Sequence, residues 1–143
     1  MSIRTTSKSA LFLMELIIAI LFFSVASAVC IRLFVQSHLI SQNTVNINQS
    51  VLVSQNIAEA FSSSDSDIAS LSALLNVTPI SDHDLEIYCD NNWVSCKKPD
   101  ASYIASVIFR EEDGLHYIDI DVHDRKSHSF YTLSVSNYIQ KTS

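Results

Sequence analysis

A long apolar run from Ala10 to Ile31 constrains the fold of this chain more than any other feature. The run contains neither Gly nor Pro and has roughly the twenty residues that a helix needs to cross the hydrocarbon core of a membrane. Two basic residues, Arg4 and Lys8, precede it, which favours a cytoplasmic N-terminus. The sequence therefore predicts a single-pass membrane protein that contacts lipid through this helix and has an extracytoplasmic C-terminal domain.

One ionisable side chain, Glu15, interrupts the run near its N-terminal end. A carboxylate inside a membrane costs on the order of 2 to 4 kcal/mol on insertion scales, so its position needs a physical explanation. Two explanations are open. The side chain can extend to the nearby headgroups, or a second subunit can supply a positive charge to it.

The order of residues around Glu15 resembles the N-terminus of type IV pilins and type II secretion pseudopilins. A short basic leader is followed by the small residue Ala10, by Leu11-Phe12-Leu13-Met14, by Glu15 and by a long apolar stretch. The resemblance implies that a prepilin peptidase cuts between Ala10 and Leu11 and that the new amine of Leu11 is methylated. It also implies that Glu15 pairs with the N-terminal amine of a neighbouring pilin-like subunit. The family usually has Gly where this chain has Ala10, and Phe directly after the cut.

Two other functions compete with a pilin-like subunit in a pilus or in a secretion or competence pseudopilus. Ala26-Ser27-Ala28 fits a signal-peptidase site of the A-x-A type, and cleavage after Ala28 would release a secreted domain. An uncut leader would leave a membrane-anchored binding or sensor domain that does not polymerise. Glu15 is unusual in a signal peptide, and the apolar pattern continues through the A-x-A site, so the sequence favours the pilin-like subunit.

The helical pattern continues beyond the membrane segment as far as Phe61, again without Gly or Pro. A stripe at alternating spacings of four and three predicts a face that packs on a sheet or on another helix. Its members are Leu33, Ser37, Ile40, Thr44, Ile47, Val51, Ser54, Ala58 and Phe61. A polar turn follows, and Asp65 or Asp67 can cap a short helix from Ile68 to Leu75.

Alternating segments in the last third of the chain predict an antiparallel meander of three or four strands. The predicted strands are Leu85–Cys89, a short Trp93–Cys96, Tyr103–Arg110, Leu115–His123 and Ser129–Asn137. The fold class is therefore α+β, with a long N-terminal helix packed on a small sheet, as the pilin resemblance also implies. We divide the chain into a leader (1–10), a membrane half (11–31) and an amphipathic half (32–61) of one helix, a loop with a short helix (62–84) and a β domain (85–143).

Charge and cysteine content limit the partners of the C-terminal part. Fourteen of the fifteen acidic residues but only seven of the nine basic residues follow Ile31, so direct nucleic-acid binding is not expected. Cys89 and Cys96 flank the turn sequence Asp90-Asn91-Asn92. A hairpin can bring the two sulfurs together as a disulfide outside the cytoplasm, and two free thiols in a core are the alternative.

The strongest metal candidates are Asp119, Asp121 and His123, since side chains two apart on a strand share a face. His116 or His128 can join them, whereas Asp82-His83-Asp84 is more typical of a loop. A solvated strand face is the more economical interpretation, so we expect neither a metal nor another cofactor. No catalytic motif is present and we expect no enzymatic activity. Trp93 is expected to pack in the hairpin.

Overall fold

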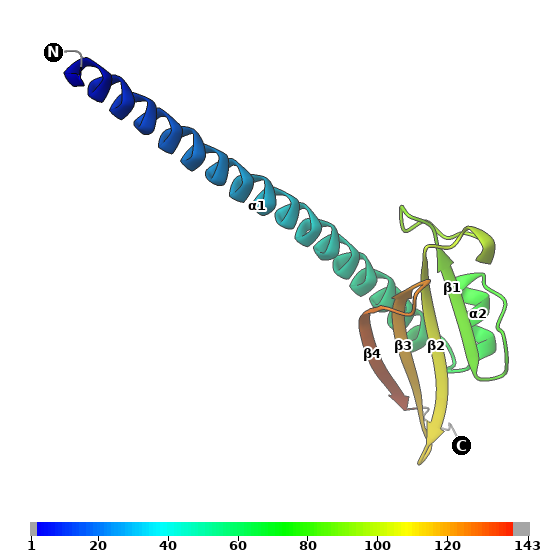
Figure 1. Ribbon diagram of the computed structural model, residues 1–143. Helices are drawn as coiled ribbons and strands as arrows, with labels where there is room; N and C mark the ends of the chain where they lie inside the picture. Colours follow the sequence, from blue (N-terminus) through cyan, green and yellow to red (C-terminus); the bar gives the residue numbers. More distant parts are fainter. Residues whose placement is uncertain (1–2, 139–143) are drawn as a thin grey trace. The chain divides into compact units, whose positions relative to one another are not determined.

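A computed structural model of the chain describes residues 3–138, and the side chains from Lys8 onward. The predicted leader and the predicted end of the β domain therefore lie partly outside the described residues, at 1–2 and 139–143. The elements are α1 (Ile3–Ser63), α2 (Ile68–Leu75), β1 (Asp84–Cys89), the 3₁₀ turn η1 (Lys98–Asp100), β2 (Tyr103–Glu112), β3 (Leu115–Asp124) and β4 (Ser129–Tyr138) (Figure 1). The predicted α+β fold, a long helix with a small antiparallel sheet, is confirmed.

The chain divides into two compact units after Asn43. The first unit consists of the first part of α1, in which all described side chains from Lys8 to Asn43 are exposed. No Gly or Pro lies in this stretch, so nothing in its backbone opposes a helix, although it buries no side chain within the chain.

The second unit, from Thr44 onward, contains a four-stranded sheet in the order β1-β2-β3-β4, with all neighbours antiparallel. The turn between β2 and β3 is formed by Asp113 and Gly114 with φ of 54° and 77°, as a tight hairpin with this Asp-Gly pair requires. A register shift at Val122 and His123 marks a bulge between β3 and β4. The predicted strands at Leu85, Tyr103, Leu115 and Ser129 are confirmed to within two residues at each end.

The core of this unit lies between one face of the sheet and the last turns of α1. Ile57 and Phe61 of α1 are buried, and the Phe61 ring meets the Phe109 ring of β2 edge to face, with centroids 5.4 Å apart. The sheet contributes Leu85, Ala105, Val107, Ile118, Ile120 and Val122, and α2 contributes Leu71. The apolar face predicted on β3 from the alternation of its residues is thus the face that is buried in the core.

The predicted packing stripe on α1 is confirmed only in its second half. Ser54 and Phe61 are buried, but Thr44 and Ile47 are exposed, as is every member before them. Ten-residue strands span about 33 Å, which covers only about 22 residues of a helix, so a sheet packed on the end of α1 cannot reach Leu33, Ser37 and Ile40. The buried positions in this part of α1 are Ser50, Ser54, Ile57 and Phe61.

The predicted short helix has the predicted bounds, Ile68–Leu75. Asp67 occupies its N-cap position without a side-chain hydrogen bond. Asn76 ends the helix in the left-handed conformation (φ 54°), where its N–H donates to the carbonyls of the last turn.

The segment Trp93–Cys96 is not a strand, so that prediction was wrong. Only one residue of it, Ser95, bridges to β1, opposite Cys89. Two features limit strand pairing with β1 to Ser95. Before it, Trp93 has a positive φ of 62°, and after it Pro99 lies in the turn η1. The turn predicted at Asp90–Asn92 is present: the N–H of Trp93 donates to the carbonyl of Asp90 at 3.0 Å.

Candidate functional site

The residues implicated by the pilin resemblance lie close together on the exposed surface of α1. Ala10, Leu11 and Glu15 are all exposed, and Leu11 and Glu15 are four residues apart and therefore share a face of the helix. The ion pairs of the described residues join Arg110 to Asp119 and His116 to Glu111, so the Glu15 carboxylate belongs to neither of them.

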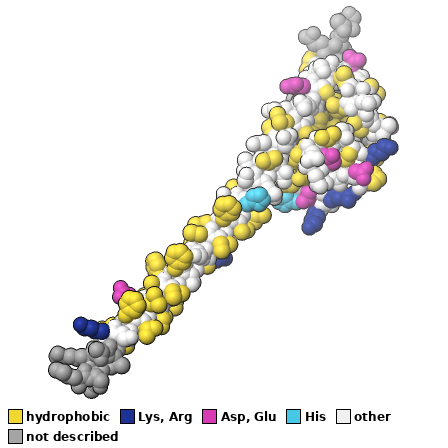
Figure 2. All heavy atoms as spheres, turned by 90° about the horizontal axis from the view of Figure 1, so that it is seen from above, with side chains coloured by type: hydrophobic (Ala, Val, Ile, Leu, Met, Phe, Trp, Pro, Cys, Tyr) yellow, Lys and Arg dark blue, Asp and Glu magenta, His cyan; other side chains and the backbone are white. Residues whose placement is uncertain are grey.

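The surface around Glu15 is apolar over a long distance. Large exposed hydrophobic side chains run along α1 from Leu11 to Ile40, and Figure 2 shows them along the visible side of this helix. This part of α1 is long and apolar enough to cross a membrane. Thirty helical residues extend about 45 Å, however, whereas the hydrocarbon core of a bilayer is about 30 Å thick. The helix therefore carries more apolar surface than one bilayer crossing covers.

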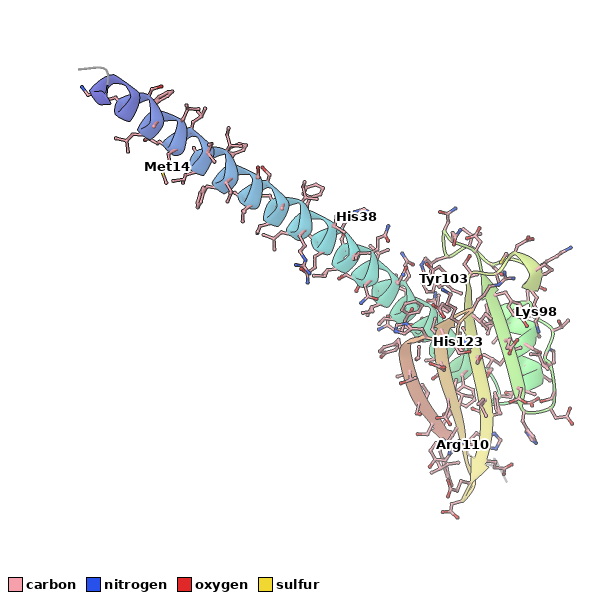
Figure 3. All side chains as sticks on the ribbon, in the orientation of Figure 1. Met14, His38, Lys98, Tyr103, Arg110 and His123 are labelled. Atoms are coloured by element: carbon pink, nitrogen blue, oxygen red, sulfur yellow. The ribbon has the colours of Figure 1, made fainter. Side chains whose placement is uncertain are left out.

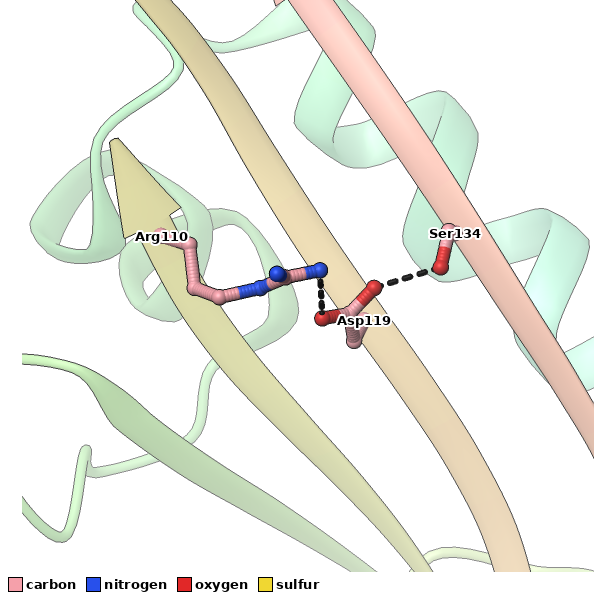
Figure 4. A network of polar contacts seen from close by, with 3 residues as sticks. All are labelled: Arg110, Asp119 and Ser134. Carbon is pink, nitrogen blue, oxygen red and sulfur yellow. Dashed lines mark hydrogen bonds and ion pairs between the residues drawn. The ribbon is translucent and has the colours of Figure 1, made fainter. Parts of the chain in front are cut away.

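Each of the three metal candidates on β3 contacts a different protein group. The Asp119 carboxylate pairs with the Arg110 guanidinium and accepts a hydrogen bond from the Ser134 hydroxyl (Figure 4). Asp121 accepts from the Ser129 hydroxyl, and His123 Nδ1 donates to the carbonyl of Ile104 at 3.1 Å. The three side chains lie on the polar face of the sheet, and cross-strand pairing satisfies them there.

The remaining histidines do not join these three residues. His116 Nδ1 donates to the carbonyl of Ser66 at 2.7 Å, and its Nε2 lies 3.9 Å from Glu111. The His128 ring meets the Phe130 ring edge to face at 5.4 Å. The residues that the structure describes contain no group of three or more His, Cys, Asp or Glu side chains arranged to hold a metal ion.

Cys89 and Cys96 are both free thiols, with Cys89 buried and Cys96 half-buried. Burial raises the pKa of the Cys89 thiol, so less of it is in the reactive thiolate form than in an exposed cysteine. The isolated bridge places Ser95 opposite Cys89, and Cys96 is its next neighbour along the chain. The charge of the Cys96 thiolate also raises the pKa of Cys89, so the two thiols interact. A disulfide between them remains a prediction.

An aromatic cluster surrounds the same hairpin. The Trp93 ring stacks on the Tyr103 ring at 4.0 Å and 7°, and Phe130 meets Tyr103 edge to face at 5.8 Å. The Tyr103 hydroxyl donates to the Asn46 side-chain oxygen on α1 at 3.2 Å. Trp93 thus packs in the hairpin as the sequence predicted, and Tyr103 connects the hairpin to the helix.

Sequence reasoning missed a group of basic residues beside this cluster. Lys97 and Lys98 follow β1, and Arg125 and Lys126 follow β3. The Arg125 guanidinium donates to the carbonyl of Pro99 at 2.8 Å, which brings the two loops together (the site of Lys98 is labelled in Figure 3). The signal was present as two adjacent basic pairs in an otherwise acidic domain, but only the strand pairing shows that the loops are neighbours.

Comparisons of the chain with protein-family models, with curated proteins and with solved structures find no match. The case for a function therefore depends on the residues of the chain and on its geometry.

Proposed function

We propose that this protein is a pilin-like or pseudopilin-like structural subunit. It is held in the membrane as a precursor, is cut between Ala10 and Leu11 by a prepilin peptidase, and assembles through α1 into a pilus or a secretion or competence pseudopilus. The N-terminus of the precursor is cytoplasmic and the folded domain is extracytoplasmic.

One observation carries the proposal: α1 exposes apolar side chains over about 45 Å, beyond the length that a bilayer core covers. A simple anchor needs apolar surface only inside the membrane. Leu33, Phe34, Val35, Leu39 and Ile40 are 54 to 80% exposed and follow the predicted membrane half. Helices of neighbouring subunits would bury these side chains in an assembled filament.

Glu15 supports the same proposal, because it is exposed on an apolar helix surface. After cleavage, Leu11 would supply an amine on the same face, and the amine of one subunit can neutralise the carboxylate of the next. In an apolar environment an ion pair is strongly preferred over two separated charges. Such a pair would define the register between subunits.

The experiment that tests processing is the intact mass of the mature protein from its native host. A chain that begins at methylated Leu11 supports the proposal. A chain that begins at Val29 indicates a secreted domain, and an uncut N-terminus indicates a membrane anchor.

Assembly is tested separately with Glu15→Ala. We expect this variant to insert into the membrane and to retain its fold, but to be absent from sheared surface filaments or from the cross-linked pseudopilus. Glu59→Ala is the matched control, since Glu59 is also an exposed glutamate on α1 but lies in the domain. Normal assembly of the Glu15→Ala variant would contradict the proposed role of this residue.

A further inference from the structure

The two ends of the sheet in the second unit carry opposite charge. At one end Cys89 pairs with Tyr103 and Tyr103 with Asp124, and the basic residues follow directly in the adjoining loops. We call this the basic end; its cations are Lys97, Lys98, Arg125 and Lys126, all exposed.

The other end, where Glu112 pairs with Leu115, carries seven of the fourteen acidic residues of the second unit. His116 and Asn137 hold Ser66 there, through hydrogen bonds of 2.7 Å each, so the loop after α1 belongs to this end as well. The acidic residues of this end are Asp65, Asp67, Asp82, Asp84, Glu111, Glu112 and Asp113.

Of the three acidic residues at the basic end, Asp90 and Asp124 accept hydrogen bonds in their own turns, whereas Asp100 is exposed. Asp90 Oδ1 accepts the N–H groups of Asn92 and Val94 at 2.8 and 3.0 Å. Asp124 Oδ1 accepts those of Lys126 and His128 at 2.8 and 2.9 Å, and the hydrogen bond from His128 is the main cause that lowers the pKa of Asp124. These carboxylates accept from backbone amides, whereas the Lys98 ammonium lies 5.8 Å from the centre of the Tyr88 ring and the Lys97 and Lys126 side chains are exposed.

The basic end is also the end at which α1 joins the domain. The hydrogen bond between Asn46 and Tyr103 places the start of the packed part of α1 there, whereas Phe61 contacts Phe109 further along β2. In Figure 3, Tyr103 and Lys98 lie toward one end of the sheet and Arg110 lies toward the other.

The connection between the membrane segment and the basic end is short. Headgroups extend about 5 to 8 Å beyond the hydrocarbon core, which is about five helical residues past Ile31 and therefore near Gln36. The eight residues from Gln36 to Thr44 span at most about 12 Å as a helix. The hairpin projects three residues beyond Cys89, at most about 10 Å at 3.3 Å per residue, which is most of this distance.

The tip of this hairpin has the side chains of a membrane interface. Val94 is 60% exposed and follows Trp93, which stacks on Tyr103, packs against the core and is half-buried. Tryptophan is enriched where headgroups meet hydrocarbon, and lysine and arginine are attracted by anionic headgroups.

We propose that the basic end docks on anionic phospholipid headgroups of the leaflet through which α1 leaves the membrane. The acidic end then points away from the surface, as electrostatic repulsion favours. The inference rests on α1 spanning a membrane and does not require assembly into a filament.

The only tryptophan of the chain, Trp93, lies at the docking surface and reports on it directly. The test reconstitutes the full chain, one molecule per nanodisc, in phosphatidylcholine alone or mixed with phosphatidylglycerol. Quenching of Trp93 fluorescence by neutral acrylamide is then measured. We expect weaker quenching in the anionic discs and recovery of the quenching at high salt, since salt screens the attraction.

Lys97→Gln/Lys98→Gln should abolish this protection. Each basic residue near an anionic surface changes the docked-to-undocked ratio by about fivefold, so the double variant should lower it by about 25-fold. Gln55→Glu/Asn56→Asp is the matched control, because it makes the same change in net charge at exposed positions of α1 and should retain the protection. Unchanged quenching in zwitterionic discs shows that each variant is folded.

Equal quenching of the wild-type chain in both lipids would overturn the proposal, as would full protection in Lys97→Gln/Lys98→Gln. Protection that depends on protein concentration and not on lipid charge would also overturn it, and would assign the basic end to the acidic end of a second copy. None of these outcomes depends on Glu15 or on cleavage at Leu11, so the pilin-like function is tested independently.

Discussion

Ser54→Ala should stabilise the domain, although it removes a polar group from a helix that packs on the sheet. Ser54 is completely buried, and its hydroxyl has no hydrogen-bond partner among the described residues. A buried unsatisfied hydroxyl costs about 1 to 3 kcal/mol, and alanine is a better helix former than serine by about 0.5 kcal/mol. Loss of the oxygen's packing offsets part of this, so we expect a gain of about 1 to 2 kcal/mol.

Ser50→Ala is the matched control, one turn earlier on the same face of α1. Ser50 is equally buried, but its hydroxyl donates to the carbonyl of Asn46 at 2.7 Å. Its removal loses a hydrogen bond worth about 0.5 to 1.5 kcal/mol and gains the same helix propensity, so stability should be unchanged or fall by up to about 1 kcal/mol. The two variants should therefore differ by about 2 kcal/mol in the free energy of unfolding.

Urea unfolding of the full chain in detergent micelles, followed by Trp93 fluorescence, measures this difference. With a dependence on urea of about 1 to 3 kcal/mol per molar, the two midpoints should be separated by about 1 M. A loss of stability in Ser54→Ala, or equal midpoints for the two variants, would refute the assignment of Ser54 as an unsatisfied buried group.

Two other perturbations test the core and the outer face of the sheet. Phe61→Ala removes a fully buried ring from the contact with Phe109 and should lower the free energy of unfolding by about 3 to 5 kcal/mol in the same assay. Leu52→Ala, at a 52% exposed site on α1, should lower it by less than about 0.5 kcal/mol. Equal losses in the two variants would mean that another face of α1 packs on the sheet. The hydrogen bond from Tyr88 to Glu86 raises the pKa of Tyr88 to about 12, so this contribution to stability is complete below about pH 10 and is lost as the pH rises toward 12. The ionisation of Tyr88 is followed by phenolate absorbance and is identified by the difference from Tyr88→Phe. In Glu86→Gln, Tyr88 should ionise at lower pH. An unchanged titration would exclude Glu86 as the cause of the raised pKa.

Much of the secondary structure was predictable because its signals are local. The helix α2 has the predicted bounds, and the Asp-Gly turn between β2 and β3 lies where the strand pattern stops. The candidate site on α1 was predictable for the same reason, since Ala10, Leu11 and Glu15 are neighbours along one helix. The structure adds that these three side chains are exposed and therefore accessible to partners.

The sequence did not predict which groups face one another across the strands. Trp93–Cys96 was predicted as a strand, but Ser95 is the one residue of this segment that bridges to β1, opposite Cys89. Asp119 was a weak metal candidate beside Asp121, and its partners, Arg110 from β2 and Ser134 from β4, were not predicted. A sequence pattern indicates which face a residue shares, but it does not identify the group across the strand.

The sequence by itself determined that this chain has one long apolar helix with a single carboxylate near its start, followed by an antiparallel α+β domain. These properties follow from periodicity and from the absence of Gly and Pro, which act over a few residues. Only the tertiary structure decided where the domain ends along α1, since the length of the strands limits how much of the helix the sheet can bury. It also decided that Lys97, Lys98, Arg125 and Lys126 form one basic end, because strand pairing brings together loops that are almost thirty residues apart.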